Sequence, residues 1–186
     1  MRLDRRDVLA GIAAMFGTAV FAPIARAASA QMTPISDGPP STPVFTAQQR
    51  ALMSALSDRI MPTTDTPGAI AAGVPEFIEK MLADWAVPDE RKVIVAGLDA
   101  IEARSQADFQ IAAVNATPEQ QDALITLAME DKIPDGLSFF TKFRQLVITG
   151  YFTSEIGITQ ERDYLPVPGR YDGAYPYSPG TKVFSS

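Results

Sequence analysis

The chain of 186 residues contains no cysteine and no histidine. Without cysteine it forms no disulfide, so its stability depends on packing alone. The two missing residue types are the usual protein ligands of haem, iron–sulfur clusters and zinc. Their absence also excludes Ser–His–Asp and Cys–His catalysis and the commonest general base near neutral pH. We therefore expect no catalytic residue, no metal ligand and no cofactor-binding residue in this chain.

Sequence patterns that cradle phosphates or calcium are missing as well. Neither G-x-G-x-x-G nor G-x-x-x-x-G-K-[ST] occurs, because Val74 and Pro75 follow Gly73 where lysine and Ser/Thr are needed. A carboxylate site for calcium or magnesium stays open, but no EF-hand loop is present. The formal net charge of −6 argues against nucleic acid as a partner. No basic cluster indicates anionic lipid, so we expect membrane association only through partners.

The N-terminus carries a pattern typical of protein export. Arg5 and Arg6 precede a moderately apolar run over residues 8–24 that is rich in alanine and glycine. This combination predicts a twin-arginine signal over residues 1–27, read by the twin-arginine translocase, and a periplasmic protein at the inner-membrane face. Small-x-small patterns end at Ala27 and Ala30. The alternative is an uncleaved anchor, for which the run is short.

The export signal raises a question about cofactors. The twin-arginine route carries folded proteins, often folded around a cofactor, and this chain lacks the residues that usually hold one. The simplest interpretation is that the cofactor sits in a partner. The first 27 residues carry four arginines and two aspartates, so residues 28–186 have a net charge of −8. Their length suits one core.

Five helices are expected between residues 46 and 157, after a Pro/Ser-rich linker over residues 28–45. The predicted helices cover residues 46–61, 74–85, 88–109, a segment that begins at Thr117-Pro118, and 137–151. Capping-box residues open the first and fourth, and proline with acidic residues opens the third. The second places Val74, Phe77, Ile78, Met81, Leu82 and Trp85 on one apolar face.

The fifth predicted helix has large apolar side chains round most of its surface. It is expected to be the central, largely buried helix; a buried strand fits the composition but not the length. We predict an all-α fold: a compact bundle of about five helices with an N-terminal signal and linker and an extended C-terminal tail over residues 158–186. Prolines and glycines are expected to prevent any helix beyond Gly157, itself a candidate left-handed cap.

Three segments are candidates for a partner interface. In the loop after the first helix, Asp65 and the threonine hydroxyls are suited to hold a turn or to dock on a partner. Its candidate residues are Thr64, Asp65, Thr66, Pro67 and Gly68. At the end of the fifth helix they are Tyr151, Phe152, Thr153, Ser154 and Glu155, where the two aromatic residues either close the core or face a partner. In the tail they are Tyr164, Tyr171, Tyr175 and Tyr177, which either wrap a partner or pack on the bundle.

Two of these segments resemble a known family. Residues 59–69 read RIMPTTDTPGA and residues 72–78 read AGVPEFI, which resembles the start of the gluconate 2-dehydrogenase subunit 3 family. Residues 150–157 read GYFTSEIG and residues 165–171 read LPVPGRY, which resembles its C-terminal signature. The resemblance spans about residues 45–175.

The resemblance implies a non-catalytic small subunit of a periplasmic sugar, polyol or sugar-acid dehydrogenase. In such complexes a large flavin subunit holds FAD and oxidises the substrate, and a multihaem cytochrome c subunit often passes the electrons on. The small subunit typically carries the twin-arginine signal for both. Close members often have a cysteine able to bridge to the large subunit, and the lack of cysteine excludes that link here. The alternatives are a free-standing periplasmic ligand-binding helical domain and an independent enzyme that uses acidic residues and tyrosines.

Overall fold

The computed structural model describes residues 38–165, 167, 169, 174, 176, 178 and 180–185. Arg5, Arg6, Tyr171, Tyr175 and Tyr177 lie outside the described residues. Within them the regular secondary structure is almost all helical, with one short pair of strands, which confirms the all-α prediction. The elements are α3 (Ala47–Ile60), α4 (Val74–Asp84), α5 (Pro88–Phe109), η1 (Ala113–Asn115), α6 (Pro118–Met129), α7 (Gly136–Thr153), η2 (Gly157–Glu161), β1 (Asp163–Tyr164) and β2 (Phe184–Ser185).

The helix starts follow the capping signals of the sequence. Thr46 and Thr117 each form a complete capping box, with Gln49 and Gln120 as the reciprocal partners. Pro88 occupies the first turn of α5, where a missing N–H is harmless. The α5 helix ends at Phe109 because Gln110 takes a left-handed conformation with φ 59°. Local chemistry therefore sets these boundaries.

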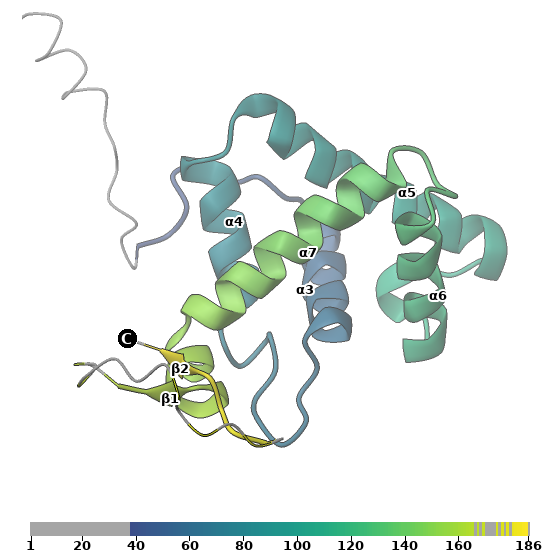
Figure 1. The fold of residues 1–186 in the computed structure, drawn as a ribbon. Coiled ribbons are helices and arrows are strands. Elements are labelled where there is room, and N and C mark those ends of the chain that lie inside the picture. The colour runs from purple at the N-terminus through teal and green to yellow at the C-terminus, as the bar shows by residue number, and fades with distance from the viewer. Residues whose placement is uncertain are drawn as a thin grey trace, which may run out of the picture. The chain divides into compact units, whose positions relative to one another are not determined.

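The α7 helix runs through the middle of the bundle and packs against α3, α4, α5 and α6 (Figure 1). Its approach to α5 is close: a Cβ added at Gly97 of α5 would lie 2.1 Å from the Phe139 ring. The prediction that α7 is buried on most of its surface is wrong. Its buried side chains form one stripe that includes Phe139, Phe143 and Val147, whereas Leu137 is 49% exposed. Apolar composition therefore overstates burial, since one face of α7 still meets water.

The described part of the expected linker lies against the bundle. Phe45 is buried in the core, and the Ser41 N–H donates to Asp84 of α4 at 3.0 Å. The Lys80 ammonium donates to the Pro39 carbonyl oxygen at 3.3 Å. The Pro/Ser-rich composition did not predict this attachment, because it depends on hydrogen bonds that involve backbone atoms and on the burial of Phe45 at the end of the segment.

Just beyond α7, residues 157–161 differ from the extended tail that was expected. A single π-helical turn, η2, follows α7, and β1 pairs in parallel with β2, with Asp163 opposite Phe184. Gly157 is not the left-handed cap of α7: the helix ends at Thr153, Ser154 is the cap residue, and Gly157 begins η2. None of the described helices has the length and apolarity needed to cross a membrane.

Candidate partner-binding site

The loop between α3 and α4 is held by its own backbone and by one hydroxyl. The Thr63 hydroxyl oxygen accepts from the Gly68 N–H at 3.0 Å, and the Ala69 N–H donates to the Met61 carbonyl oxygen at 2.8 Å. A Cβ at position 68 would lie 2.5 Å from the Thr63 nitrogen, so only glycine fits there. One of the threonine hydroxyls expected to hold this turn, that of Thr63, therefore does so, although Thr63 is not among the predicted interface residues.

Tyr151 joins the end of α7 to this loop. Its hydroxyl donates to the Pro67 carbonyl oxygen at 2.9 Å and lies 3.4 Å from the Thr66 hydroxyl. The Tyr151 side chain is only 2% exposed, and its ring packs edge-on against Phe152 with centroids 5.2 Å apart. Two segments 84 residues apart thus form one unit.

The segment after α7 closes over the same loop. The Ser154 hydroxyl donates to the Tyr151 carbonyl oxygen at 2.6 Å and accepts from the Gly157 N–H at 3.0 Å. A Cβ at position 157 would lie 2.0 Å from the Tyr151 carbonyl oxygen. Close approach of the backbone, rather than a positive φ, therefore requires glycine there. From η2, Glu161 accepts a hydrogen bond of 2.7 Å from the Thr66 hydroxyl.

Charged side chains attach the tail to this unit. The Arg162 guanidinium lies 4.6 Å from the centre of the Phe152 ring, within cation–π range. The Lys182 ammonium donates to the Gln160 carbonyl oxygen. The Thr64 hydroxyl, which donates to the Asp65 carboxylate at 2.9 Å, is the main cause of a lowered pKa at Asp65, and the positive charge of Lys182 adds to it. We use the name motif site for the region formed by the loop between α3 and α4, the end of α7, η2, β1 and β2.

The predicted interface residues fall into three groups. Five are exposed: Thr64, Asp65, Thr153, Glu155 and Tyr164. Four are half-buried: Thr66, Pro67, Phe152 and Ser154. Tyr151 and Gly68 are buried and shape the site from within. The structure therefore brings the loop, the helix end and Tyr164 into one region, with outward hydroxyl, carboxylate and aromatic groups.

Sequence reasoning missed Glu161, Arg162 and Lys182. Each makes its contact with a residue distant in sequence or with a backbone atom, which no local pattern indicates. The position of Glu161 and Arg162 just after the GYFTSEIG segment was the one available signal.

The chemical groups of the motif site suit binding. It offers aromatic rings and a guanidinium, which are enriched in protein interfaces, together with hydroxyls and carboxylates, which suit a polar rim. Among the described residues, no three His, Cys, Asp or Glu side chains gather closely enough to hold a metal ion. No buried side-chain nitrogen or oxygen within the described residues lacks a hydrogen-bond partner.

A comparison with protein families matches the part of the chain that contains most segments of the motif site. The model of the family described as gluconate 2-dehydrogenase subunit 3 matches residues 47–169. No curated protein and no solved structure matches the chain. The matched range contains the bundle from α3 to α7, the loop that ends at Gly68, and Tyr151. The match covers most of the chain and confirms the resemblance seen in the two segments: the chain belongs to the gluconate 2-dehydrogenase subunit 3 family.

Proposed function

We propose that this chain is the non-catalytic small subunit of a periplasmic flavin-dependent dehydrogenase that oxidises a sugar, polyol or sugar acid. It binds and stabilises the large subunit, which holds FAD and performs the oxidation. It also carries the large subunit through the twin-arginine translocase by means of Arg5 and Arg6. A multihaem cytochrome c subunit is the proposed third partner, through which the complex associates with the membrane.

The observation that carries this proposal is the motif site. The two segments that resemble the family lie far apart in the sequence, yet Tyr151 and Pro67 join them directly. Side chains on the outer surface, such as Thr64, Thr153 and Glu155, make no essential contribution to the core, because they are exposed. A surface that is built by buried contacts and presents polar groups outward suits recognition of another protein.

The export signal supports the second half of the proposal. The N-terminal pattern is typical of a signal that exports folded proteins, yet the chain has no cysteine or histidine to hold a cofactor. Both facts are explained when the exported cofactor belongs to a partner. The partner must then bind in the cytoplasm, before transport. The acidic balance of residues 28–186 also fits a role in protein contacts rather than in binding nucleic acid.

Affinity purification from the periplasm tests the proposal. The full chain with a C-terminal tag is expected to recover a large protein whose absorption spectrum shows oxidised flavin and whose sugar oxidation is retained. Deleting the gene for the small subunit is expected to remove flavoprotein activity from the periplasm. Full periplasmic activity in the deletion strain would refute the proposal.

A matched pair of charge reversals localises the contact. Glu155→Arg changes an exposed carboxylate in the motif site, and Glu130→Arg makes the same change at the end of α6. The first is expected to weaken recovery of the flavoprotein and the second to leave it unchanged, at equal thermal stability of the two variants. Equal recovery with both variants would place the contact elsewhere on the bundle.

A further inference from the structure

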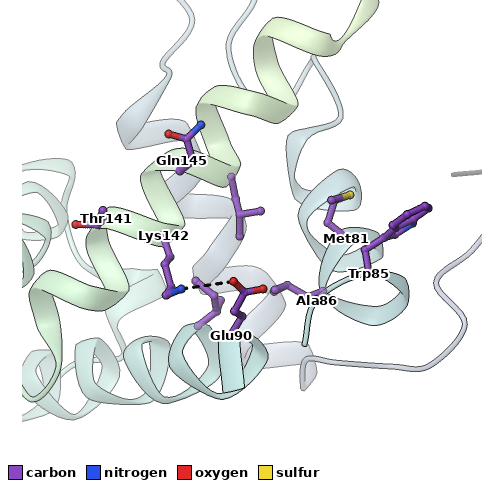
Figure 2. Close-up of a pocket in the computed structure, with 10 residues that line it drawn as sticks. Met81, Trp85, Ala86, Glu90, Thr141, Lys142 and Gln145 are labelled. Atoms are coloured by element: carbon purple, nitrogen blue, oxygen red, sulfur yellow. Dashed lines mark ion pairs between the residues drawn. The ribbon is translucent and has the colours of Figure 1, made fainter. Parts of the chain in front are cut away.

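A second feature of the surface is an apolar pocket between the end of α4, the start of α5 and the middle of α7 (Figure 2). Its volume is about 430 Å³. The apolar side chains that line it are Met81, Leu82, Trp85, Ala86, Ile94 and Leu146. A largely apolar hollow of this kind is typical of sites that bind an apolar group.

Polar groups lie only at the edge of this pocket. The Lys142 ammonium of α7 and the Glu90 carboxylate of α5 form an ion pair of 3.7 Å across the opening, and both side chains remain about half exposed (Figure 2). Gln145 and Thr141 of α7 are also exposed at the edge. An apolar centre with a charged, hydrated rim is the usual anatomy of a contact between two proteins.

Apolar surface continues outside the pocket. Trp85 was expected on the buried face of α4, but it is the residue that ends the helix, with φ −123°, and its side chain is 40% exposed. Val87, two residues on, is 57% exposed. A small molecule held inside the pocket would leave Val87 in water, whereas a protein surface covers Trp85 and Val87 together. The occupant that this arrangement favours is therefore a side chain on a larger partner.

A stripe of apolar residues on α4 connects the pocket to the motif site. Phe77, Met81 and Trp85 follow one another at four-residue spacing and so lie on one face of α4. At the other end of this stripe, Phe77 packs so closely on α7 that a Cβ at Gly150 would lie 2.6 Å from its ring. Gly150 precedes Tyr151, which belongs to the motif site. The pocket and the motif site are thus two ends of one helix contact.

We propose that the pocket between α4, α5 and α7 receives an apolar side chain of the flavin-containing subunit and forms one continuous interface with the motif site. This inference rests on the proposed function, because it names the anchor of that same complex. Anchors of this type are large apolar or aromatic side chains that enter a pocket near the centre of an interface. The Glu90–Lys142 pair would then form part of the polar rim.

Two matched substitutions test the anchor with the flavoprotein that the wild-type chain recovers. Trp85→Lys removes one wall of the pocket, and Met129→Lys makes the same change at an exposed apolar residue of α6. Trp85→Lys is expected to weaken binding of the flavoprotein about tenfold or more, the size typical of a central interface residue, and Met129→Lys to change it less than about twofold. Equal affinity of both variants would overturn the inference.

A labelling experiment does not depend on how well Trp85→Lys folds. The chain has no cysteine, so Val87→Cys introduces a single thiol beside the pocket, and Ala123→Cys introduces one on the exposed surface of α6. In the complex, thiol labelling of Val87→Cys is expected to slow about tenfold relative to the free chain, while Ala123→Cys keeps its rate.

The outcomes separate the two proposals. If the wild-type chain recovers no flavoprotein, the proposed function fails and the inference fails with it. If it recovers the flavoprotein but Val87→Cys reacts equally fast in the free chain and in the complex, the inference alone is overturned. If a medium-chain fatty acid such as decanoate shifts the fluorescence emission of Trp85, the chain's one tryptophan, and the complex leaves Val87→Cys unprotected, the pocket holds a small ligand instead.

Discussion

The Tyr151 hydroxyl donates a hydrogen bond of 2.9 Å to the Pro67 carbonyl oxygen, across 84 residues of sequence. This contact joins the end of α7 to the loop between α3 and α4, and Tyr151 itself is buried. Through it, one side chain of the core sets the position of a loop whose neighbouring residues Thr64 and Asp65 face outward. The shape of the motif site therefore depends on the packing of the bundle.

Tyr151→Phe removes this hydrogen bond without removing the ring. We expect the free energy of unfolding to fall by about 1 kcal/mol, because the Pro67 oxygen loses its donor while the aromatic packing persists. Urea denaturation measures the change. Tyr164→Phe, which makes the same change at an exposed tyrosine, is expected to stay within about 0.5 kcal/mol of the wild type. Equal stability of the two variants would contradict a role for the Tyr151 hydroxyl.

Gly157→Ala tests the close approach after α7. The added Cβ would meet the Tyr151 carbonyl oxygen at 2.0 Å, so the turn has to move, at a cost of about 1–3 kcal/mol. Gly169→Ala is the control, because no atom lies within 4 Å of the Cβ it would add. Denaturant midpoints of the two variants give the comparison. A Gly157→Ala midpoint as high as that of Gly169→Ala would argue against a close approach of Gly157 to the end of α7.

Arg50 and Glu79 link α3 to α4 through two hydrogen bonds of 2.6 and 2.7 Å. Glu79 is 7% exposed, so removing its partner leaves a carboxylate with little water around it. Arg50→Ala is expected to lower the free energy of unfolding by more than the loss of a fully exposed ion pair does, because Glu79 is left without its partner.

Lys92→Ala provides the matched control for Arg50→Ala. It breaks an exposed pair, Lys92–Asp89, and is expected to cost less than about 0.5 kcal/mol. Both costs come from chemical denaturation at neutral pH. A loss for Arg50→Ala no larger than that for Lys92→Ala would show that the α3–α4 pair contributes as little as a solvated one.

Asp84 gives the protein a defined acid sensitivity. Hydrogen bonds from the Ser41 side chain, the Lys80 ammonium and the Ser41 backbone lower the pKa of Asp84 from 3.8 to about 2. The Asp84 carboxylate therefore binds a proton less tightly in the folded state than in the unfolded state. The stability that this carboxylate contributes is complete above about pH 4 and is lost as the pH falls through about 2.

Asp84→Asn isolates this effect. The difference in unfolding free energy between wild type and variant is expected to be constant from pH 7 to about pH 4 and to shrink towards pH 2. Denaturant titrations at a series of pH values measure it. A difference that stays constant down to pH 2 would show that Asp84 is not held in its charged form by Ser41 and Lys80.

Sequence patterns predicted the helices well because local chemistry sets their ends. The Thr46 and Thr117 capping boxes and the proline start of α5 are present in the structure as the sequence indicates. Burial was harder to predict: α7 exposes Leu137, and Trp85 turns outward at the end of α4. Periodicity indicates which residues share a face, but the neighbouring helices decide how much of that face is covered.

The motif site was predicted as separate segments rather than as one unit. Its joining contacts run between residues far apart, such as Thr66 with Glu161, and such pairs leave no local signal. The π-helical turn after α7 depends on the Gly157 contact with Tyr151 and was missed for the same reason. The interface role of these residues, and the export role of Arg5 and Arg6, remain predictions.

The most direct test of the central claim is the location of the flavoprotein when the proposed export signal of the small subunit is disabled. Arg5→Lys with Arg6→Lys keeps the charge and removes the arginine pair that we propose the translocase reads. Cell fractionation is expected to find both the small subunit and the active flavoprotein in the cytoplasm. A flavoprotein that still reaches the periplasm in full amount would contradict the claim that this chain carries it there.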